Sequence, residues 1–470
     1  MSVVLINPPN FFKRGRPYSP EHDIFGAHKY GLYPSLGLLY LAALLEQRGI
    51  QVKIVDIIAP PRKMNEAMEM ILAEEPQVIG ISATTMQIRG AVQIAEAIRS
   101  LRKNVLIGLG GVHITSDPDF INRFPIFDFG LVGEGEITFP KLVSNILHGE
   151  KPKGIFYGER ATKLDDLPFP ARHLIDKRNY CEEEEGVAIL ATRGCPFNCI
   201  FCCSIAMGRK VRYRSPENIV DEMEEIKDEY HGRFRFVDDT FTINKERAFR
   251  LCTEVINRKL NVKWSCSTRA DCVDESLLEI MHKAGCEYIA FGVESGSERV
   301  RNNIVRKNIM NTDIFRALRL CKKIGIKTGC YLMLGFPTET LEEMYQTVNI
   351  SLKLDADIIG VHLTQLMPGT DLFLDAVKNG ITTFDVFDKY ARGELKAWPL
   401  YVPSGVTIDD MYEARKDAYR KFFFRPQFIL QRLLLDLNSL QMLVNDVRMA
   451  LHLFSRGASP AEPSEWCLEE

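Results

Sequence analysis

The sequence predicts an α/β protein made of a doubly wound, Rossmann-like parallel sheet, six further β/α units and a helical C-terminal region. Short apolar strands alternate with amphipathic helices over residues 1–150 and again over residues 186–370. Alternation of this kind, with short connections, is typical of parallel sheets. From about residue 371 the pattern becomes helical.

Changes in composition divide the chain into five segments. A proline-containing, extended stretch separates the two alternating parts, and the last residues are rich in Pro, Ser, Gly and acidic residues, which is typical of disorder. We expect a first domain at 1–150, a linker at 151–185, a second domain at 186–370, a helical region at 371–455 and a disordered tail at 456–470.

Each element of the first domain is marked by its residue pattern. The first strand, 3–6, is apolar and ends in Asn-Pro-Pro. We expect Ser35 to cap a helix at 36–48, which Gly49 ends. Apolar residues at helical spacing predict the later helices. The other strands are expected at 52–57, 77–82, 105–108 and 127–132, and the other helices at 65–73, 87–103 and 139–147.

The second domain contains six strand candidates separated by helical patterns. The strands are expected at 187–191, 234–237, 262–265, 288–292, 329–334 and 358–363. The helices include 216–230, 248–258, 275–284 and 313–324.

The C-terminal region contains amphipathic helix candidates at 409–424, 427–437 and 440–454. The run 419–426 mixes basic and aromatic residues, and we expect its aromatic side chains to pack on the second domain. Contact with a membrane surface or a lipophilic substrate is the alternative.

Composition excludes several classes of protein. Hydrophobic residues make up 46% and charged residues 26%, as in ordinary globular proteins, and a net charge of -3 creates no strong field for nucleic acid. No apolar run reaches transmembrane length, and the first residues lead directly into a strand rather than a signal peptide. None of the 12 cysteines precedes Cys181. We therefore expect free thiols and a cytoplasmic location.

Three cysteines lie on one short segment, in the run Gly-Cys-Pro-Phe-Asn-Cys-Ile-Phe-Cys. They are Cys195, Cys199 and Cys202, with the spacing C-x3-C-x2-C. Three thiolates on one loop can bind three irons of a [4Fe–4S] cube and leave the fourth iron open. A structural zinc site is the alternative. Such sites usually close with four ligands, and no second C-x2-C or H-x3-H pair follows here.

With Phe201 before the last cysteine, this run resembles the signature of the radical SAM superfamily. The resemblance implies that the open iron binds S-adenosylmethionine, whose reductive cleavage yields a 5′-deoxyadenosyl radical. It also implies that the six β/α units form a partial (β/α)6 barrel, in which chemistry lies at the carboxyl ends of the strands. The resemblance extends over about residues 1–430.

The strand ends of the first domain resemble those of the cobalamin-binding domain that precedes the barrel in many members of the superfamily. Small residues let a flat or bulky ligand approach the backbone closely, and in the family these loops surround the nucleotide tail of cobalamin. The residues that this resemblance assigns to cobalamin are Ser82, Thr84, Thr85, Gly110, Gly111, Gly133 and Gly135.

The first loop departs from cobalamin domains that ligate cobalt through histidine. Those domains use D-x-H-x-x-G, whereas this chain has His28 and Gly31 in that pattern but lacks the aspartate. Metal-bound histidines normally have such a partner. We therefore expect His28 to be a loop residue and not a ligand of cobalt.

Polar residues at the ends of two predicted barrel strands match family positions that bind S-adenosylmethionine. Adjacent carboxylates need a nearby cation, and the methionyl ammonium is such a cation. The resemblance assigns Asp238 and Asp239 to the segment that holds this amine. We expect one of the two to face the ligand and the other to form a salt bridge or cap a turn. Arg269 suits the methionyl carboxylate through a two-point contact, and an ion pair with Glu294 or Asp271 is the alternative.

The next two strand ends complete the expected binding site. Glu294 is expected to accept hydrogen bonds from the ribose or the amine, because a buried carboxylate without a partner would be costly, and Ser295 is expected to assist. Gly335 lies in a turn that resembles the one behind the adenine. Glu339 is expected to cap the helix that follows. No residue is assigned to catalysis itself.

The resemblance carried by the cysteine run and the strand-end residues implies a cobalamin-dependent radical SAM enzyme. Such an enzyme is expected to methylate an unactivated carbon of a small molecule, a lipid or a tetrapyrrole. A cyclase, ring rearrangement or oxidation with the same architecture is the alternative. A reductant such as flavodoxin or ferredoxin is an expected partner.

Two further hypotheses are an iron–sulfur scaffold or sensor and a methylthiotransferase. Methylthiotransferases carry three cluster cysteines in their first domain, where this chain has none.

Overall fold

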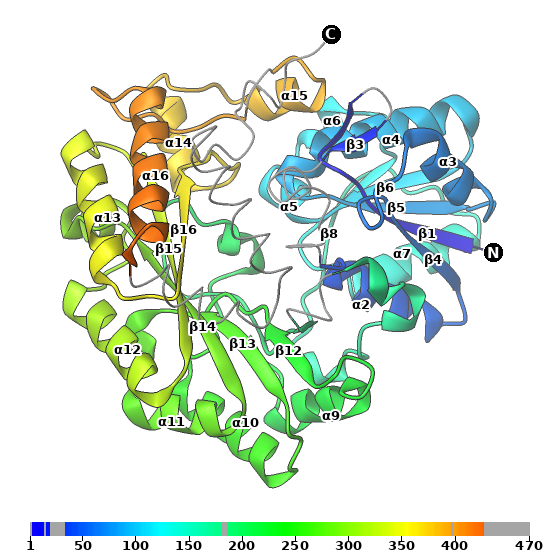
Figure 1. Ribbon diagram of the computed structural model, residues 1–470. Helices are drawn as coiled ribbons and strands as arrows, with labels where there is room; N and C mark the ends of the chain where they lie inside the picture. Colours follow the sequence, from blue (N-terminus) through cyan, green and yellow to red (C-terminus); the bar gives the residue numbers. More distant parts are fainter. Residues whose placement is uncertain (1, 14–15, 19–32, 181–185, 396–397, 427–470) are drawn as a thin grey trace.

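The computed structural model describes residues 2–13, 16–18, 33–180, 186–395 and 398–426. Two parallel six-stranded sheets, each covered by helices, lie side by side in the molecule (Figure 1). The first sheet is drawn in blue to cyan and the second in green to yellow. This arrangement confirms the predicted fold class.

The first sheet has the strand order β4-β1-β5-β6-β7-β8, and all of its neighbouring strands are parallel. The order reverses between β1 and β5, and ligands of open parallel sheets bind beyond the strand ends at such a reversal. The strands are β1 (Ser2–Asn7), β4 (Gln51–Asp56), β5 (Val78–Ser82), β6 (Leu106–Gly110), β7 (Phe129–Val132) and β8 (Gly154–Tyr157). The helices are α2 (Leu36–Glu46), α3 (Met64–Leu72), α4 (Ile88–Leu101), α5 (Val112–Ser116), α6 (Phe120–Arg123) and α7 (Thr138–Leu147).

Two features of this half were not predicted. The edge strand β8 lies inside the expected linker, and it pairs with β7 as the last strand of the sheet. A hairpin of β2 (Phe11–Lys13) and β3 (Arg16–Tyr18) precedes α2. Ser35 occupies the N-cap position of α2, but its side chain makes no capping hydrogen bond, so the predicted cap is wrong in this respect.

The second sheet contains all six predicted barrel strands in the order β16-β15-β14-β13-β12-β9. Every neighbouring pair is parallel, and the alternate residues that face the helices form one continuous apolar core. The strands are β9 (Val187–Ile189), β12 (Arg233–Phe236), β13 (Lys263–Thr268), β14 (Cys286–Glu294), β15 (Lys327–Leu334) and β16 (Ile358–Leu363). The helices are α9 (Pro216–Ile226), α10 (Lys245–Asn257), α11 (Glu275–Lys283), α12 (Asn311–Ile324) and α13 (Leu341–Lys353).

A later helix, α16 (Ile408–Phe423), covers the edge of this sheet and packs on α13 and β16. Its Tyr419 hydroxyl accepts a hydrogen bond from the Val361 N–H at 2.9 Å and donates to the Val361 carbonyl at 3.2 Å. An uncovered edge strand would leave such groups unpaired. The helix predicted at 409–424 is thus the sixth helix that covers the second sheet, after α9 to α13.

Much of the chain between β16 and α16 joins the apolar core of the first half, whereas Val402 and Val406 pack on that of the second. Helices α14 (Asp371–Lys378) and α15 (Val386–Ala391) belong to the same apolar cluster as β1, β5 and α4. The Arg123 Nε of α6 contacts the carboxylate of Asp388 in α15 at 2.6 Å. Figure 1 shows α15 at the top of the molecule, beside α4 and α6.

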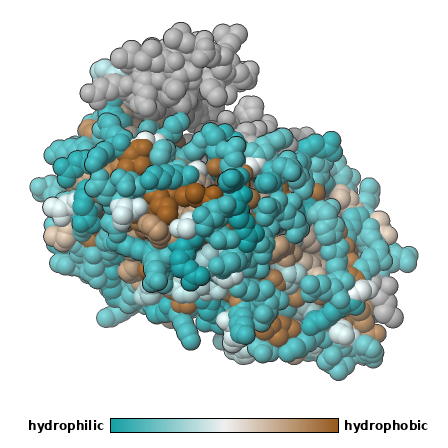
Figure 2. All heavy atoms as spheres, turned by 90° about the horizontal axis from the view of Figure 1, so that it is seen from below, coloured by the Kyte–Doolittle hydropathy of each residue, from teal (hydrophilic) through white to brown (hydrophobic). Residues whose placement is uncertain are grey.

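Along the described part of the chain, no helix is both long and apolar enough to cross a membrane. The face seen from below is mostly hydrophilic, with separate apolar patches between hydrophilic residues (Figure 2). His28, the helices expected at 427–437 and 440–454, and the tail from 456 lie outside the described residues.

His113 of α5 is fully buried where α15 meets the first half of the molecule. Its ring packs edge-on against Phe120 at 4.7 Å and against Phe387 at 6.3 Å. Neither ring nitrogen has a hydrogen-bond partner among the described residues. Because burial disfavours the charged form, the pKa of His113 falls from 6.5 to about 3.

We expect His113→Leu to reduce the acid sensitivity of the fold. Between about pH 6.5 and 3 the unfolded chain binds a proton at His113 and the folded chain does not, so the stability that this group confers is lost as the pH falls. From pH 7.5 to 5 the variant should lose about 2 kcal/mol less of its free energy of unfolding than the wild type. Urea unfolding at both pH values measures this difference, and equal losses in the two proteins would contradict it.

Candidate functional site

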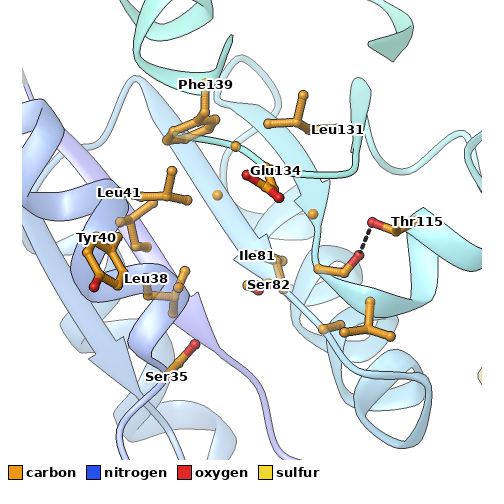
Figure 3. A pocket seen from close by; sticks show the side chains of 18 of the residues that line it. Ser35, Leu38, Tyr40, Leu41, Ile81, Ser82, Thr115, Leu131, Glu134 and Phe139 are labelled. Carbon is orange, nitrogen blue, oxygen red and sulfur yellow. Dashed lines mark hydrogen bonds between the residues drawn. The ribbon is translucent and has the colours of Figure 1, made fainter. Parts of the chain in front are cut away.

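A cavity lies above the carboxyl ends of β1, β5, β6 and β7, at the reversal of strand order. Its volume is about 420 Å³, which is within the range of pockets for small molecules and cofactors. Leu38 and Leu41 of α2 and Phe139 of α7 form its apolar sides (Figure 3). The cavity therefore extends as a slot between the sheet and these two helices.

Six of the seven residues assigned to cobalamin line this cavity, namely Ser82, Thr84, Gly110, Gly111, Gly133 and Gly135. The seventh, Thr85, is buried and is not among the lining residues. Thr84 is held in place by its hydroxyl, which bonds the side chain of Gln87 at 2.9 Å. Thr115, which sequence analysis missed, accepts the Gly133 N–H at 2.9 Å and donates to the Gly111 carbonyl at 2.8 Å. It therefore joins two of the three loops.

Two adjacent glycines serve this cavity in different ways. Gly111 has a φ of +97°, and a Cβ there would lie 2.6 Å from the Ala83 carbonyl oxygen, so the fold itself requires glycine. At Gly110 the nearest atom to an added Cβ is 4.0 Å away. Gly110 therefore leaves space that a ligand can fill.

The far wall of the cavity comes from the second domain. Leu190, Arg193 and Val237 extend from the ends of barrel strands and the segments after them, and Ala206 and Met207 follow the three cysteines. The cavity is thus shared between the two halves of the molecule and borders residues 194–211, which carry the three cysteines and are called the cysteine loop below.

Cys195, Cys199 and Cys202 lie on the segment between the two short strands β10 (Thr192–Arg193) and β11 (Arg212–Tyr213), and all three line one small cavity. Within the described ranges, no group of three His, Cys, Asp or Glu side chains converges closely enough to hold a single metal ion. A [4Fe–4S] cube makes a different demand, because each thiolate binds its own iron. Burial raises the pKa of Cys199 to about 11, so its thiol must lose a proton when iron binds.

The two aspartates after β12 have different surroundings. Asp239 is exposed, and its carboxylate accepts the Ser204 hydroxyl at 2.8 Å, which lies 3.1 Å from the sulfur of Cys202. Asp238 is buried and accepts the Ala191 N–H at 3.3 Å, with its pKa raised to about 6 by burial. Asp239 is therefore the member that borders the cysteine loop, whereas Asp238 bonds the backbone just before β10.

Arg269 lies beneath the cysteine loop, with its guanidinium carbon 3.5 Å from the centre of the Phe197 ring. It forms a two-point ion pair with Asp271, at 3.0 and 2.8 Å, and donates to the Lys307 carbonyl at 2.7 Å. Its Nη1 is buried without a partner among the described residues. The structural ion pair therefore exists, and one donor remains for an anionic group such as a carboxylate.

Glu294 has the partner that sequence analysis did not identify. Its carboxylate lies 2.6 Å from the ammonium of Lys307, and both side chains are buried. Lys307 therefore offsets the cost of burying the Glu294 carboxylate, a role that the sequence analysis had assigned to a ligand. Ser295 is fully buried, and its hydroxyl lies 3.2 Å from that of Thr347 in α13.

Gly335 and Glu339 form one closed turn after β15. Gly335 has a φ of +97°, and a Cβ there would meet Met411 of α16 at 2.2 Å. The buried carboxylate of Glu339 accepts the N–H groups of Gly335 and Phe336 at 2.7 and 3.0 Å. Thr340 caps α13, so the role expected for Glu339 is corrected. The Phe336 ring lies 5.7 Å from that of Phe201, which connects this turn to the cysteine loop.

The donor sets fit the three expected cofactors. Three thiols on one loop suit a cube with one open iron, and the unpaired Nη1 of Arg269 suits the carboxylate of S-adenosylmethionine. The glycine-lined slot with apolar sides suits a bulky organic group.

Comparison with known proteins agrees with this division. Residues 189–350 match the family model of the radical SAM superfamily, and residues 23–143 match that of the B12 binding domain. An uncharacterized methyltransferase of Pyrococcus horikoshii is 30% identical over 85% of this chain and 89% of its own length. An anaerobic magnesium-protoporphyrin IX monomethyl ester cyclase of Rubrivivax gelatinosus is 27% identical over 87% of this chain and 77% of its own.

Among solved structures, the chain resembles the radical S-adenosylmethionine methyltransferase TsrM of Kitasatospora setae with cobalamin and a [4Fe–4S] cluster bound. The TM-score is 0.69 at 18% identity, over 91% of this chain and 89% of the other. At this identity the likeness concerns the fold.

Proposed function

We propose, because the chain belongs to the cobalamin-dependent radical SAM enzymes, that it transfers a methyl group to an unactivated carbon of a small-molecule, lipid or tetrapyrrole substrate. One observation carries the proposal. The cavity assigned to cobalamin is walled on one side by residues of the cysteine loop, so the two cofactors would face one another. The methyltransferase from Pyrococcus horikoshii supports methyl transfer in particular.

The proposed ligands of the cluster and of S-adenosylmethionine all come from the second half of the molecule. Cys195, Cys199 and Cys202 would hold the cluster. Asp239, Arg269 and the Glu294–Lys307 pair would bind S-adenosylmethionine beside it. When bound, the cluster and S-adenosylmethionine would supply a radical by reductive cleavage, and cobalamin would supply a methyl carrier. Protein side chains lack this chemistry.

The residues of this chain bind and orient the cofactors and exclude water. The ion pair of Arg269 with Asp271 and its contact with Phe197 fix the guanidinium before any ligand arrives. Preorganised donors of this kind avoid reorganisation during the reaction. Lys307 pairs with the Glu294 carboxylate at 2.6 Å and fixes its orientation as a hydrogen-bond acceptor. A one-electron reductant such as flavodoxin or ferredoxin would complete the system, and a reducing compartment such as the cytoplasm suits the thiol ligands.

A cyclase, rearrangement or oxidation reaction is the second candidate. The similarity to the Rubrivivax gelatinosus cyclase over 87% of this chain favours it. The cofactors and the fold would be the same, so only the products separate the two reactions.

Anaerobic purification with cobalamin supplied provides the test. We expect about four irons and about one cobalamin per chain, followed by formation of S-adenosylhomocysteine with substrate candidates. Formation of 5′-deoxyadenosine alone would favour the second candidate. About four irons without cobalamin would contradict the methyltransferase proposal.

A further inference from the structure

A buried ion-pair network joins the cysteine loop to the cobalamin cavity. Arg193 lies at the end of β10, two residues before Cys195, and contacts Glu134 at 3.2 Å and Glu136 at 2.6 Å. Both acids follow β7 in the first half of the molecule, and Arg193 and both acids are buried. Its guanidinium carbon also lies 5.4 Å from the centre of the Tyr40 ring in α2. All of these contacts cross from one half to the other.

A second arginine holds the same carboxylate. Arg212 of β11 contacts Glu134 at 2.9 Å, makes a second and shorter contact with its other oxygen, and donates to the Ala161 carbonyl at 2.7 Å. Arg193 and Arg212 are direct partners in the antiparallel β10–β11 ribbon. The cysteine loop is the connection between these two strands. Both ends of that loop are therefore attached to Glu134.

Glu134 is in turn part of the cavity wall. It lies between Gly133 and Gly135, and Figure 3 shows its side chain beside the space enclosed by Leu131, Leu41 and Phe139. The backbone of this loop packs closely on Gly158, where an added Cβ would lie only 1.9 Å from the Glu134 carbonyl oxygen. Arg193 lines the cavity too, and its Nε has no partner among the described residues. A ligand in the cavity therefore meets both partners of the ion pair.

We propose that Arg193 is a positioning residue that couples cobalamin binding to the geometry of the cysteine loop. The inference rests on the proposed function, since it requires both cofactors. A ligand that orders the Gly133–Gly135 loop also orders Glu134, and the two arginines transmit this order to both ends of the loop that holds the cluster. Coupling is reciprocal, so a bound cluster must tighten cobalamin binding by the same factor.

The experiment measures the affinity for hydroxocobalamin in the full chain, with the cluster reconstituted and with the iron removed. The ratio of the two dissociation constants is the coupling factor. We expect at least about fivefold tighter binding with the cluster in the wild type. Arg193→Lys keeps the positive charge but cannot contact both Glu134 and Glu136 in the same way. The coupling factor of this variant should therefore fall to about one. Arg250→Lys, on the exposed face of α10 and paired with Glu217 at 3.5 Å, is the matched control and should keep the wild-type factor.

The coupling factors of the wild type and of Arg193→Lys together test the role of Arg193. An equal factor in the wild type and in Arg193→Lys, or a factor of one in the wild type, overturns the inference but leaves the proposed function standing. Absence of hydroxocobalamin binding to the wild type in both states overturns the cobalamin part of the proposed function as well. If Arg193→Lys does not fold, Glu136→Gln removes one of the two carboxylates from Arg193 and should lower the factor. An unchanged factor in Glu136→Gln would then contradict the proposal.

Discussion

Replacing Cys199 with alanine is expected to reduce bound iron from about four to below about one per chain and to abolish cleavage of S-adenosylmethionine. Cys199 lines the small cavity of the cysteine loop, near Lys307, Glu294 and Arg269. Its loss leaves a second iron without a protein ligand. We expect at least about a thousandfold loss of rate, or about 4 kcal/mol in the activation barrier. Iron analysis and the yield of 5′-deoxyadenosine measure the two effects.

Cys203 provides a matched control for this substitution. It is adjacent to Cys202, it is partly buried, and it does not line the cavity that the three assigned cysteines share. Cys203→Ala should retain iron and cleavage activity near wild-type values. Loss of iron in Cys203→Ala to the same extent would show that the ligand assignment is wrong.

Replacing Gly110 with leucine is expected to weaken cobalamin binding while leaving the cluster in place. An added Cβ at Gly110 has no atom nearer than 4.0 Å, so the fold can accept a side chain that extends into the cavity. The ligand would then compete with that side chain, and overpacking of this kind costs about 1–3 kcal/mol, or about 5-fold to 150-fold in affinity. Titration with hydroxocobalamin, together with iron analysis, measures the result.

The smaller substitution Gly110→Ala tests whether size is the cause. It should lose much less affinity than Gly110→Leu, and both variants should unfold at temperatures close to that of the wild type. Wild-type affinity in Gly110→Leu would mean that cobalamin does not occupy this cavity. A large drop in the unfolding temperature would instead indicate damage to β6.

Local patterns in the sequence predicted most of this architecture. All twelve strands of the two large sheets except β8 correspond to predicted apolar segments, because burial on both faces leaves a clear signal. Strand β8 is a four-residue edge strand with no fully buried side chain, so its signal is weak. The cysteine loop and the small residues at strand ends were recognised because they are contiguous in sequence.

Contacts between distant residues were not predictable in this way. Lys307 lies thirteen residues after Glu294 in a connection without an obvious motif, and only the fold brings the two charges together. Glu134, one of the partners of Arg193, lies 59 residues before it, and nothing in a single sequence pairs the two. Gly335 illustrates a third limit, because its closest neighbour comes from α16 rather than from its own turn. The assignment of Gly335 to the turn behind the adenine stays a prediction, and its packing against Met411 was not foreseen.

The return of α14 and α15 to the first half affects how the protein is made. The ribosome completes the first sheet at Tyr157, whereas Phe387 and Trp398, which finish its apolar cluster, follow roughly 240 residues later. At typical rates of synthesis this interval lasts roughly 10 to 50 s. During this time the apolar surface that α15 later covers has no native cover in the nascent chain. Synthesis of this enzyme therefore includes a stage in which apolar surface of the first half is exposed. A protein whose domains each complete their own core in sequence order would avoid this stage.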